Sequence, residues 1–331
     1  MNKVQKNAYD LIQSDARYFY TLLDMNKNNE NFNENIWLIN LPYIGIFTDG
    51  TEQWYKKIKN NDAPKFNDIE KEYYQKIRNS HKFFDKSYKE CKQLLLNMLK
   101  IHDKHFYDIR SLIEKIIGYK NIGIQVYKKE FIGNTILYNG YIPDLDMYKI
   151  KEYGKFIESV SKICGKLIDY TGATKLPIYK HDKNIFIDDK DYHFYNKSPL
   201  KIKTDLGFIL LNILCSINYA IIFVEKCFVE EIPQKLKFSY LQYYYLCDFI
   251  QEINKYNNTK FYIDSSLKNR EFRNCLAHYG LGQYLKENEI MEDDILKGLT
   301  YKSFNMSYIE CKNILFISLN SLATQIKNYI F

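Results

Sequence analysis

An uncharged stretch of 18 residues constrains the fold of this chain more than any other feature. Residues 207–224 read GFILLNILCSINYAIIFV. A segment of this length is close to the minimum that crosses a bilayer, which takes about 20 apolar residues. It contains Asn212, Ser216 and Asn218, and Glu225 follows it directly. We therefore predict a buried core helix, with a membrane-associated protein as the less favoured alternative.

Composition places the chain among globular proteins. It has 331 residues, 46% of them apolar, which excludes a disordered tail, a collagen-like repeat and a small disulfide scaffold. The net charge of +7 permits an anionic partner such as nucleic acid without requiring one. Five of the 47 basic residues are arginines, and two of these five, Arg270 and Arg273, lie three positions apart.

The cysteines indicate a reducing compartment. There are seven, they are scattered, and none forms a C-x-x-C pair. This favours free thiols over a disulfide framework or a zinc ribbon. The first twenty residues also lack the apolar segment and cleavage site of a secretory signal. We expect a cytoplasmic protein.

The C-terminal part, residues 202–331, predicts an antiparallel helical bundle. Four amphipathic segments follow one another at short intervals: about 205–229, the run after Pro233, a segment from about Ser265, and one that begins at the capping box Ser307 to Glu310. Short connections between helices favour antiparallel neighbours.

The first 200 residues predict two further regions in a mainly α-helical protein. Residues 1–120 have few helix breakers, and Asn67 and Asp68 can cap a helix that continues to about Met98, although residues 37–47 are a strand or a docked loop. Residues 121–201 predict a mixed α/β linker or insertion. Within it, IGIQVY and NTILYNGYI suggest a small hairpin, residues 151–170 a helix, and residues 171–201 a polar insertion or linker.

One C-terminal segment, residues 270–280 (REFRNCLAHYG), concentrates residues that can carry chemistry. On a helix Arg270, Asn274 and His278 share one face. Arg273 and His278 point about 140° apart on an ideal helix, so one copy does not make a compact site. Two copies that face each other across a two-fold axis would do so. The opposite side of the helix can pack into the bundle through Phe272, Leu276 and Tyr279.

These residue types suit transfer at a phosphate. Histidine can accept or give a proton near neutral pH, and arginine offers a fixed fork of donors to phosphate oxygens. Asparagine can orient either group by hydrogen bonding. The residues expected to bind substrate beside this motif are Arg270, Lys268 and Tyr279.

The run RNCLAH, Arg273 to His278, resembles the R-x4-H motif of HEPN domains, with the favoured Asn directly after the Arg. The resemblance covers about residues 202–331, and the late position of the motif in a helical bundle fits it. It implies a metal-independent endoribonuclease without a cofactor. By this resemblance Arg273 stabilises the scissile phosphate, Asn274 positions the phosphate or the histidine, and His278 is the general acid/base. The implied products carry a 2′,3′-cyclic phosphate and a 5′-hydroxyl.

The resemblance also implies a biological setting and partners. Proteins of this family are often toxins or abortive-infection effectors of prokaryotic defence. They act on RNA as dimers, so we expect a homodimer through the C-terminal bundle, with an antitoxin or a phage-derived trigger as a further partner. One branch of the family has a Tyr two residues after the His, where this chain has Gly280, which argues against control by modification at that position.

Other patterns are weaker. Arg78-Asn79-Ser80-His81 looks like a shortened copy of the motif, with two intervening residues instead of four, and we interpret it as a solvated helix face. The chain has no Gly-Lys-Ser phosphate loop, nucleophile elbow or dinucleotide fingerprint. The alternative to a nuclease is a non-catalytic module that binds RNA, a nucleotide or a protein through the same basic groove.

Overall fold

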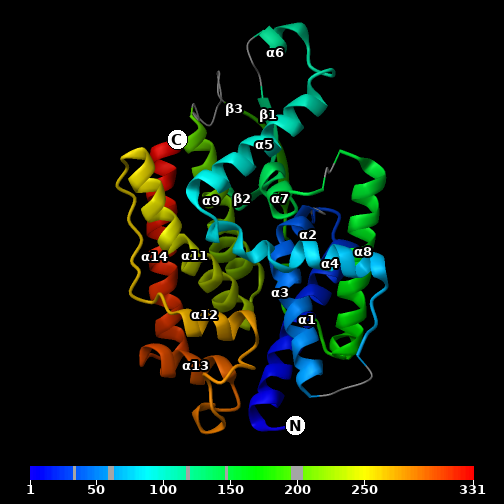
Figure 1. The fold of residues 1–331 in the computed structure, drawn as a ribbon, viewed down its shortest axis with the longest axis vertical. Helices are drawn as coiled ribbons and strands as arrows, with labels where there is room; N and C mark the ends of the chain where they lie inside the picture. The colour runs from blue at the N-terminus through cyan, green and yellow to red at the C-terminus, as the bar shows by residue number, and fades with distance from the viewer. Residues whose placement is uncertain (33–34, 59–62, 117–119, 146–147, 195–203) are drawn as a thin grey trace.

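The structure is a computed structural model, and it describes residues 1–331 except 33–34, 59–62, 117–119, 146–147 and 195–203. The chain is mainly helical with one small sheet, which confirms the predicted fold class at that level. Figure 1 shows α9 and α11 near the centre, with α14 on one side and α1, α3 and α8 on the other. The predicted region boundary at residue 201 lies outside the described residues.

The N-terminal region is built from short and long helices whose starts follow from their caps. Asn2, Asn67 and Ser87 each form a capping box with a Gln or Glu three residues later, and so begin α1, α4 and α5. The elements in this region are α1 (Lys3–Asn28), α2 (Asn35–Ile39), α3 (Leu41–Lys57), α4 (Asp68–Arg78), the 3₁₀-helix η1 (Ser80–Asp85), α5 (Tyr88–Phe106) and α6 (Leu112–Ile116).

Two expectations for this region are wrong. Residues 37–47 belong to two helices, the end of α2 and the start of α3, which meet at Asn40. Pro42 occupies the first turn of α3, where no backbone N–H is needed, and Gly45 lies against the backbone of α4. The helix that begins at Asn67 does not continue to Met98. It ends at Arg78, and η1 turns the chain before α5.

The middle region forms a three-stranded antiparallel sheet in the order β2-β1-β3 and two helices. The hairpin expected there exists, but its second strand is EFIGN. NTILYNGYI instead forms a buried helix, because the side chain of Asn134 accepts from two backbone N–H groups of its first turn. The elements are β1 (Lys120–Tyr127), β2 (Glu130–Asn134), α7 (Thr135–Tyr141), α8 (Ile150–Tyr170), the short 3₁₀-helix η2 (Ala173–Lys175) and β3 (Ile187–Phe194).

The stretch 171–201, predicted as a polar linker, supplies the third strand of this sheet. β3 pairs antiparallel with β1 along its length, from the partners Lys120 and Phe194 to Tyr127 and Ile187. Its acidic sequence gave no apolar alternation by which to recognise a strand. Backbone pairing with β1 therefore overrides a weak local preference.

The C-terminal helices confirm three of the four predicted segments. The apolar run forms α9 (Asp205–Asn218), a π-helical turn η3 (Tyr219–Val224) and α10 (Glu225–Cys227), and the side chain of Thr204 caps it. The other elements are α11 (Pro233–Asn257), α12 (Arg270–Ala277), the 3₁₀-helix η4 (Glu287–Glu289), α13 (Ile295–Phe304) and α14 (Tyr308–Ile330). α12 begins five residues after the predicted start at Ser265, and α13 has no counterpart in the prediction.

The apolar run lies in the core. Of the described residues, one helical span, Asp205–Cys227, is long and apolar enough to cross a membrane, and 94% of its most apolar window is buried inside the structure. α9 packs against β2, α14, α11 and α5, which come from all three predicted regions. The buried apolar residues of these regions form one continuous cluster.

Candidate functional site

The helix that carries the Arg-Asn-x3-His motif, α12, ends one residue before the histidine. The Asn269 side chain accepts from the Phe272 N–H and begins α12. The helix ends at Ala277, and the Gly280 N–H donates to the Cys275 carbonyl at 2.8 Å, which is the hydrogen bond of a Schellman motif. His278 is therefore the C-terminal cap and not a member of the helix face that the sequence predicted.

Tyr279 takes the left-handed conformation that this helix end requires, with φ of 55°. A bulky residue rarely adopts it, so surrounding contacts must hold it. The Tyr279 hydroxyl donates to Asp15 Oδ2, and Lys237 Nζ lies 3.7 Å from the ring centroid. Tyr279 is fully buried and presents no surface to a substrate, unlike the binding role predicted for it.

Asn274 fixes Arg273, which agrees with an orienting role for an asparagine. Arg273 Nη1 donates to Asn274 Oδ1 at 2.9 Å. The Arg273 guanidinium carbon lies 5.0 Å from the ring centroid of Tyr244 and 5.3 Å from that of Tyr245, both on α11. Two aromatic faces and one amide therefore hold this guanidinium in place.

The two other predicted binding residues lie at the start of the same segment. Lys268 Nζ pairs with Asp248 Oδ1 at 2.5 Å and lies 5.6 Å from the Tyr244 ring, so Lys268 and Arg273 share that tyrosine. Arg270 is exposed at the first position of α12. Lys268 therefore lies close to Arg273 over the same ring, and Arg270 lies three residues before Arg273 on α12.

A buried carboxylate on α3 faces His278. Asp49 Oδ2 lies 3.8 Å from His278 Nδ1, and Asp49 Oδ1 pairs with Arg78 Nε at 2.7 Å. Tyr74 Oη donates to Asp49 Oδ1 at 2.8 Å, and Gln53 Nε2 donates to Asp49 Oδ2 at 2.5 Å. The His278 side chain is 43% exposed although its Nδ1 is buried, so the accessible part of the ring lies away from Asp49.

The segment Arg78 to His81 joins this place: Arg78 and Asn79 are exposed, as a solvated helix face predicts, whereas Ser80 and His81 turn inward. η1 packs against α3 and α11, and His81 is largely buried. The ring centroids of His81 and Tyr245 lie 6.3 Å apart. Burial first, and then the positive charges of Lys82 and Arg273, lower the pKa of His81 to about 3. Arg273 lies nearly 200 positions from His81 in the sequence, so the fold brings the two residues together.

His278 shares the positive charges of Arg273 and Lys82 with His81. Burial lowers the pKa of His278 below its usual value, the Asp49 carboxylate raises it, and the positive charges of Arg273, Lys82 and Arg78 lower it. Two imidazoles with lowered pKa values therefore lie among three cations and one carboxylate.

Polar atoms without partners concentrate here. Among the described residues, nine buried side-chain nitrogen or oxygen atoms have no hydrogen-bond partner. Four of the nine belong to this place: His81 Nδ1, Tyr245 Oη, Arg273 Nε and His278 Nδ1. Buried polar atoms are nearly always paired in folded proteins, so such a cluster marks a strained or functional position.

The sequence did not point to Asp49, Tyr245 or the role of His81. The one available signal was the repeated pattern of an Arg followed by an Asn and, shortly after, a His, at positions 78–81 and 273–278. Asp49 follows the apolar run 37–47 and stands between Thr48 and Gly50, so the sequence around it gave no signal of a buried, paired acid.

One pocket lies beside η1, next to this site, and another lies between the C-terminal helices, away from the motif residues. A pocket of about 500 Å³ opens beside Asn79 and Ser80, with Lys76 and Lys86 among its lining residues. This pocket therefore adjoins the segment Arg78 to His81. Glu72 and Asp144 also line it, so its charged residues are of both signs.

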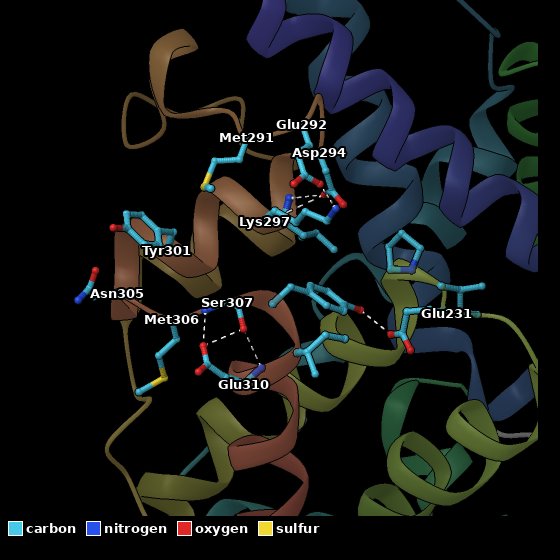
Figure 2. A pocket seen from close by; sticks show the side chains of 15 residues that line it. Glu231, Met291, Glu292, Asp294, Lys297, Tyr301, Asn305, Met306, Ser307 and Glu310 are labelled. Carbon is cyan, nitrogen blue, oxygen red and sulfur yellow. Dashed lines mark hydrogen bonds and ion pairs between the residues drawn. The ribbon is translucent and has the colours of Figure 1, made fainter.

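A pocket of about 760 Å³ lies between α13, α14 and the start of α11 (Figure 2). Its acidic groups already have partners, since Glu231 accepts from Tyr308, Glu292 pairs with Lys297, and Glu310 caps α14 through Ser307. None of the residues predicted to act on a substrate lines it.

The described residues include no group of three or more His, Cys, Asp or Glu side chains arranged to hold a metal ion. All seven cysteines are free and buried. Comparison with protein-family models, with curated proteins and with solved structures gives no match for this chain.

Proposed function

We propose that this chain is an endoribonuclease of a prokaryotic defence or toxin system and that it cleaves RNA without a metal ion. One observation supports the proposal most strongly: two imidazoles and two guanidiniums converge where four buried polar atoms have no partner. A phosphodiester supplies acceptors for such donors, and the imidazoles can exchange the protons that its cleavage requires.

Each residue of the motif has a definite task in this proposal. Arg273 binds the scissile phosphate and offsets the charge that grows on its oxygens during the reaction. Asn274 holds the Arg273 guanidinium through their 2.9 Å hydrogen bond. His278 exchanges a proton with the substrate, and Lys268 and Arg270 contact phosphates next to the cleaved one. Attack by the 2′-hydroxyl requires RNA and leaves a 2′,3′-cyclic phosphate and a 5′-hydroxyl.

The remaining features of the proposal concern setting and assembly. We place the C-terminal helices in a HEPN-like bundle and the protein in the cytoplasm, where seven buried free thiols stay reduced. The homodimer through this bundle, and control by an antitoxin or a phage-derived trigger, stay predictions.

The test compares wild type with His278→Ala on a mixed-sequence RNA in the presence of EDTA. We expect cleavage by wild type and a loss of about 10²–10⁴-fold in rate in the variant, the usual cost of a general acid or base. His105→Ala, which removes an exposed histidine on α5, is the matched control and should keep full activity. Equal cleavage by wild type and His278→Ala, or cleavage that needs added metal, would contradict the proposal. RNA binding without cleavage would identify the non-catalytic module instead.

A further inference from the structure

We propose that Arg78 and His81 form the second half of the phosphate site within the same chain, and that His81 accepts the proton of the attacking 2′-hydroxyl. This inference rests on the proposed function. It assigns a second histidine to the reaction, and it makes each chain complete without a residue from another copy.

The fold brings the two halves together on one platform. The ring centroid of Tyr245 on α11 lies 6.3 Å from the ring centroid of His81 on η1. It lies 5.3 Å from the Arg273 guanidinium carbon. α3 provides the second link, because Asp49 contacts both Arg78 and His278. Two elements of the core therefore fix both pairs relative to each other.

Two glycines allow this approach. A Cβ atom on Gly45 would lie 2.2 Å from the Ile77 carbonyl oxygen, and one on Gly50 would lie 2.0 Å from Tyr279 Cε2. Gly45 thus lets the end of α4, which carries Arg78, press against α3. Gly50 likewise lets Tyr279, the residue after His278, pack closely against α3. Asp49 lies between the two glycines on α3.

The surroundings of the two imidazoles suit different tasks. Burial, and then the positive charges of Lys82 and Arg273, keep His81 uncharged. An uncharged imidazole can accept a proton, and a phosphate anion bound beside Lys82 and Arg273 offsets the two positive charges that oppose protonation of His81. His278 faces the Asp49 carboxylate, which stabilises an imidazolium, and this charge grows more favourable when a phosphate anion binds beside it. His278 is therefore the proton donor.

These assignments give a balanced reaction. His81 takes the proton of the 2′-hydroxyl as the 2′ oxygen forms a bond to phosphorus. The bond between phosphorus and the 5′ oxygen breaks, and the 5′ oxygen takes its proton from the His278 imidazolium. The products are a 2′,3′-cyclic phosphate and a 5′-hydroxyl, with His81 protonated and His278 neutral. Exchange of protons with water restores both groups.

The first experiment measures RNA cleavage in EDTA by His81→Ala and His81→Gln. We expect each variant to lose about 10²–10⁴-fold in rate, as for removal of a general base. His81→Gln keeps a polar side chain of similar length, so a well-folded His81→Gln variant separates loss of the base from loss of the fold. His105→Ala is again the control. Full activity in a folded His81→Gln variant, beside an inactive His278→Ala, would overturn this inference and leave the proposed function in place.

The second experiment separates the roles of the two histidines. An RNA with sulfur in place of the bridging 5′ oxygen has a leaving group that needs no proton. On this substrate we expect His278→Ala to regain most of its lost activity, while His81→Gln stays impaired. Rescue of His81→Gln instead, or rescue of neither variant, would contradict the assigned roles.

The third experiment asks whether one chain carries the whole site. Inactive His81→Gln and His278→Ala proteins are mixed, denatured together, refolded and assayed. A site within one chain predicts no recovery. Recovery of activity, up to about a quarter of the wild-type rate for random pairing into dimers, would show that the two histidines act across two chains. An inactive wild type would overturn both this inference and the proposed function.

Discussion

At the scale of single residues, the protonation of His278 depends on Asp49. The carboxylate is 10% exposed, and Tyr74, Gln53 and Arg78 hold it in place. It raises the pKa of His278, whereas burial, Arg273, Lys82 and Arg78 lower it. Removal of the carboxylate should therefore lower the pKa of His278, and removal of one of the cations should raise it.

Substitution at Asp49 should therefore shift the pH dependence of cleavage. In Asp49→Asn the pKa of His278 falls, so the imidazolium is lost at lower pH and the alkaline limb of kcat/KM moves to lower pH. In Arg78→Ala the pKa of His278 rises, and the same limb moves to higher pH. Profiles of kcat/KM against pH for wild type and both variants measure these shifts. Shifts in the same direction for both variants would refute the electrostatic account of His278.

At the scale of elements, α3 organises the site. It carries Asp49, and its two glycines let α4 and the end of α12 approach it closely. The ring of Tyr279, against which Gly50 lies, is fully buried and held by Asp15 and Lys237, so it cannot move aside easily.

Gly50→Ala should therefore destabilise the protein by about 1–3 kcal/mol, the usual cost of overpacking a core. Gly154→Ala in α8 is the matched control, because a Cβ there meets nothing within 4 Å. This control should instead stabilise the helix by about 0.5–1 kcal/mol. Urea unfolding followed by circular dichroism gives both values. Equal effects of the two substitutions would show that α3 and Tyr279 are not in close contact.

The sequence was most informative where local chemistry decides the structure. The cap at Asn67 predicted the start of α4, the capping box at Ser307 predicted α14, and the apolar run at 207–224 predicted α9. It failed where distant contacts decide. Pro42 and Gly45 obscured α3, and β3 exists through its pairing with β1. The motif at 273–278 was visible, but Asp49 and His81 join it only through the tertiary fold.

At the scale of the whole molecule, one buried polar cluster connects the N-terminal helix to the C-terminal motif. Asp15 of α1 accepts from Lys237 at 2.5 Å and Gln234 at 2.8 Å, both on α11, and from Tyr279. The Lys237 and Asp15 side chains are 0% and 1% exposed. Burial lowers the pKa of Lys237, and Asp15 opposes this shift. A charge left without its partner in such a place is costly.

Asp15→Ala should therefore destabilise the protein by about 3–5 kcal/mol, the usual cost of leaving a buried charge unpaired. Asp10→Ala, an exposed position on the same helix, should change stability by no more than about 0.5 kcal/mol. Because one core spans the chain, wild type should also unfold in a single transition. Chemical denaturation that shows two separate transitions, with Asp15→Ala affecting one of them, would mean that the predicted regions are independent.

The most direct test of the central claim identifies the ends of the RNA that the protein produces. A labelled oligonucleotide is incubated with wild type in EDTA, in parallel with the same oligonucleotide carrying 2′-deoxyribose throughout. Attack by the 2′-hydroxyl predicts 2′,3′-cyclic phosphate and 5′-hydroxyl ends from the RNA, no cleavage of the deoxy strand, and loss of products in His278→Ala. Products with 3′-hydroxyl and 5′-phosphate ends, or cleavage of both strands, would contradict the account.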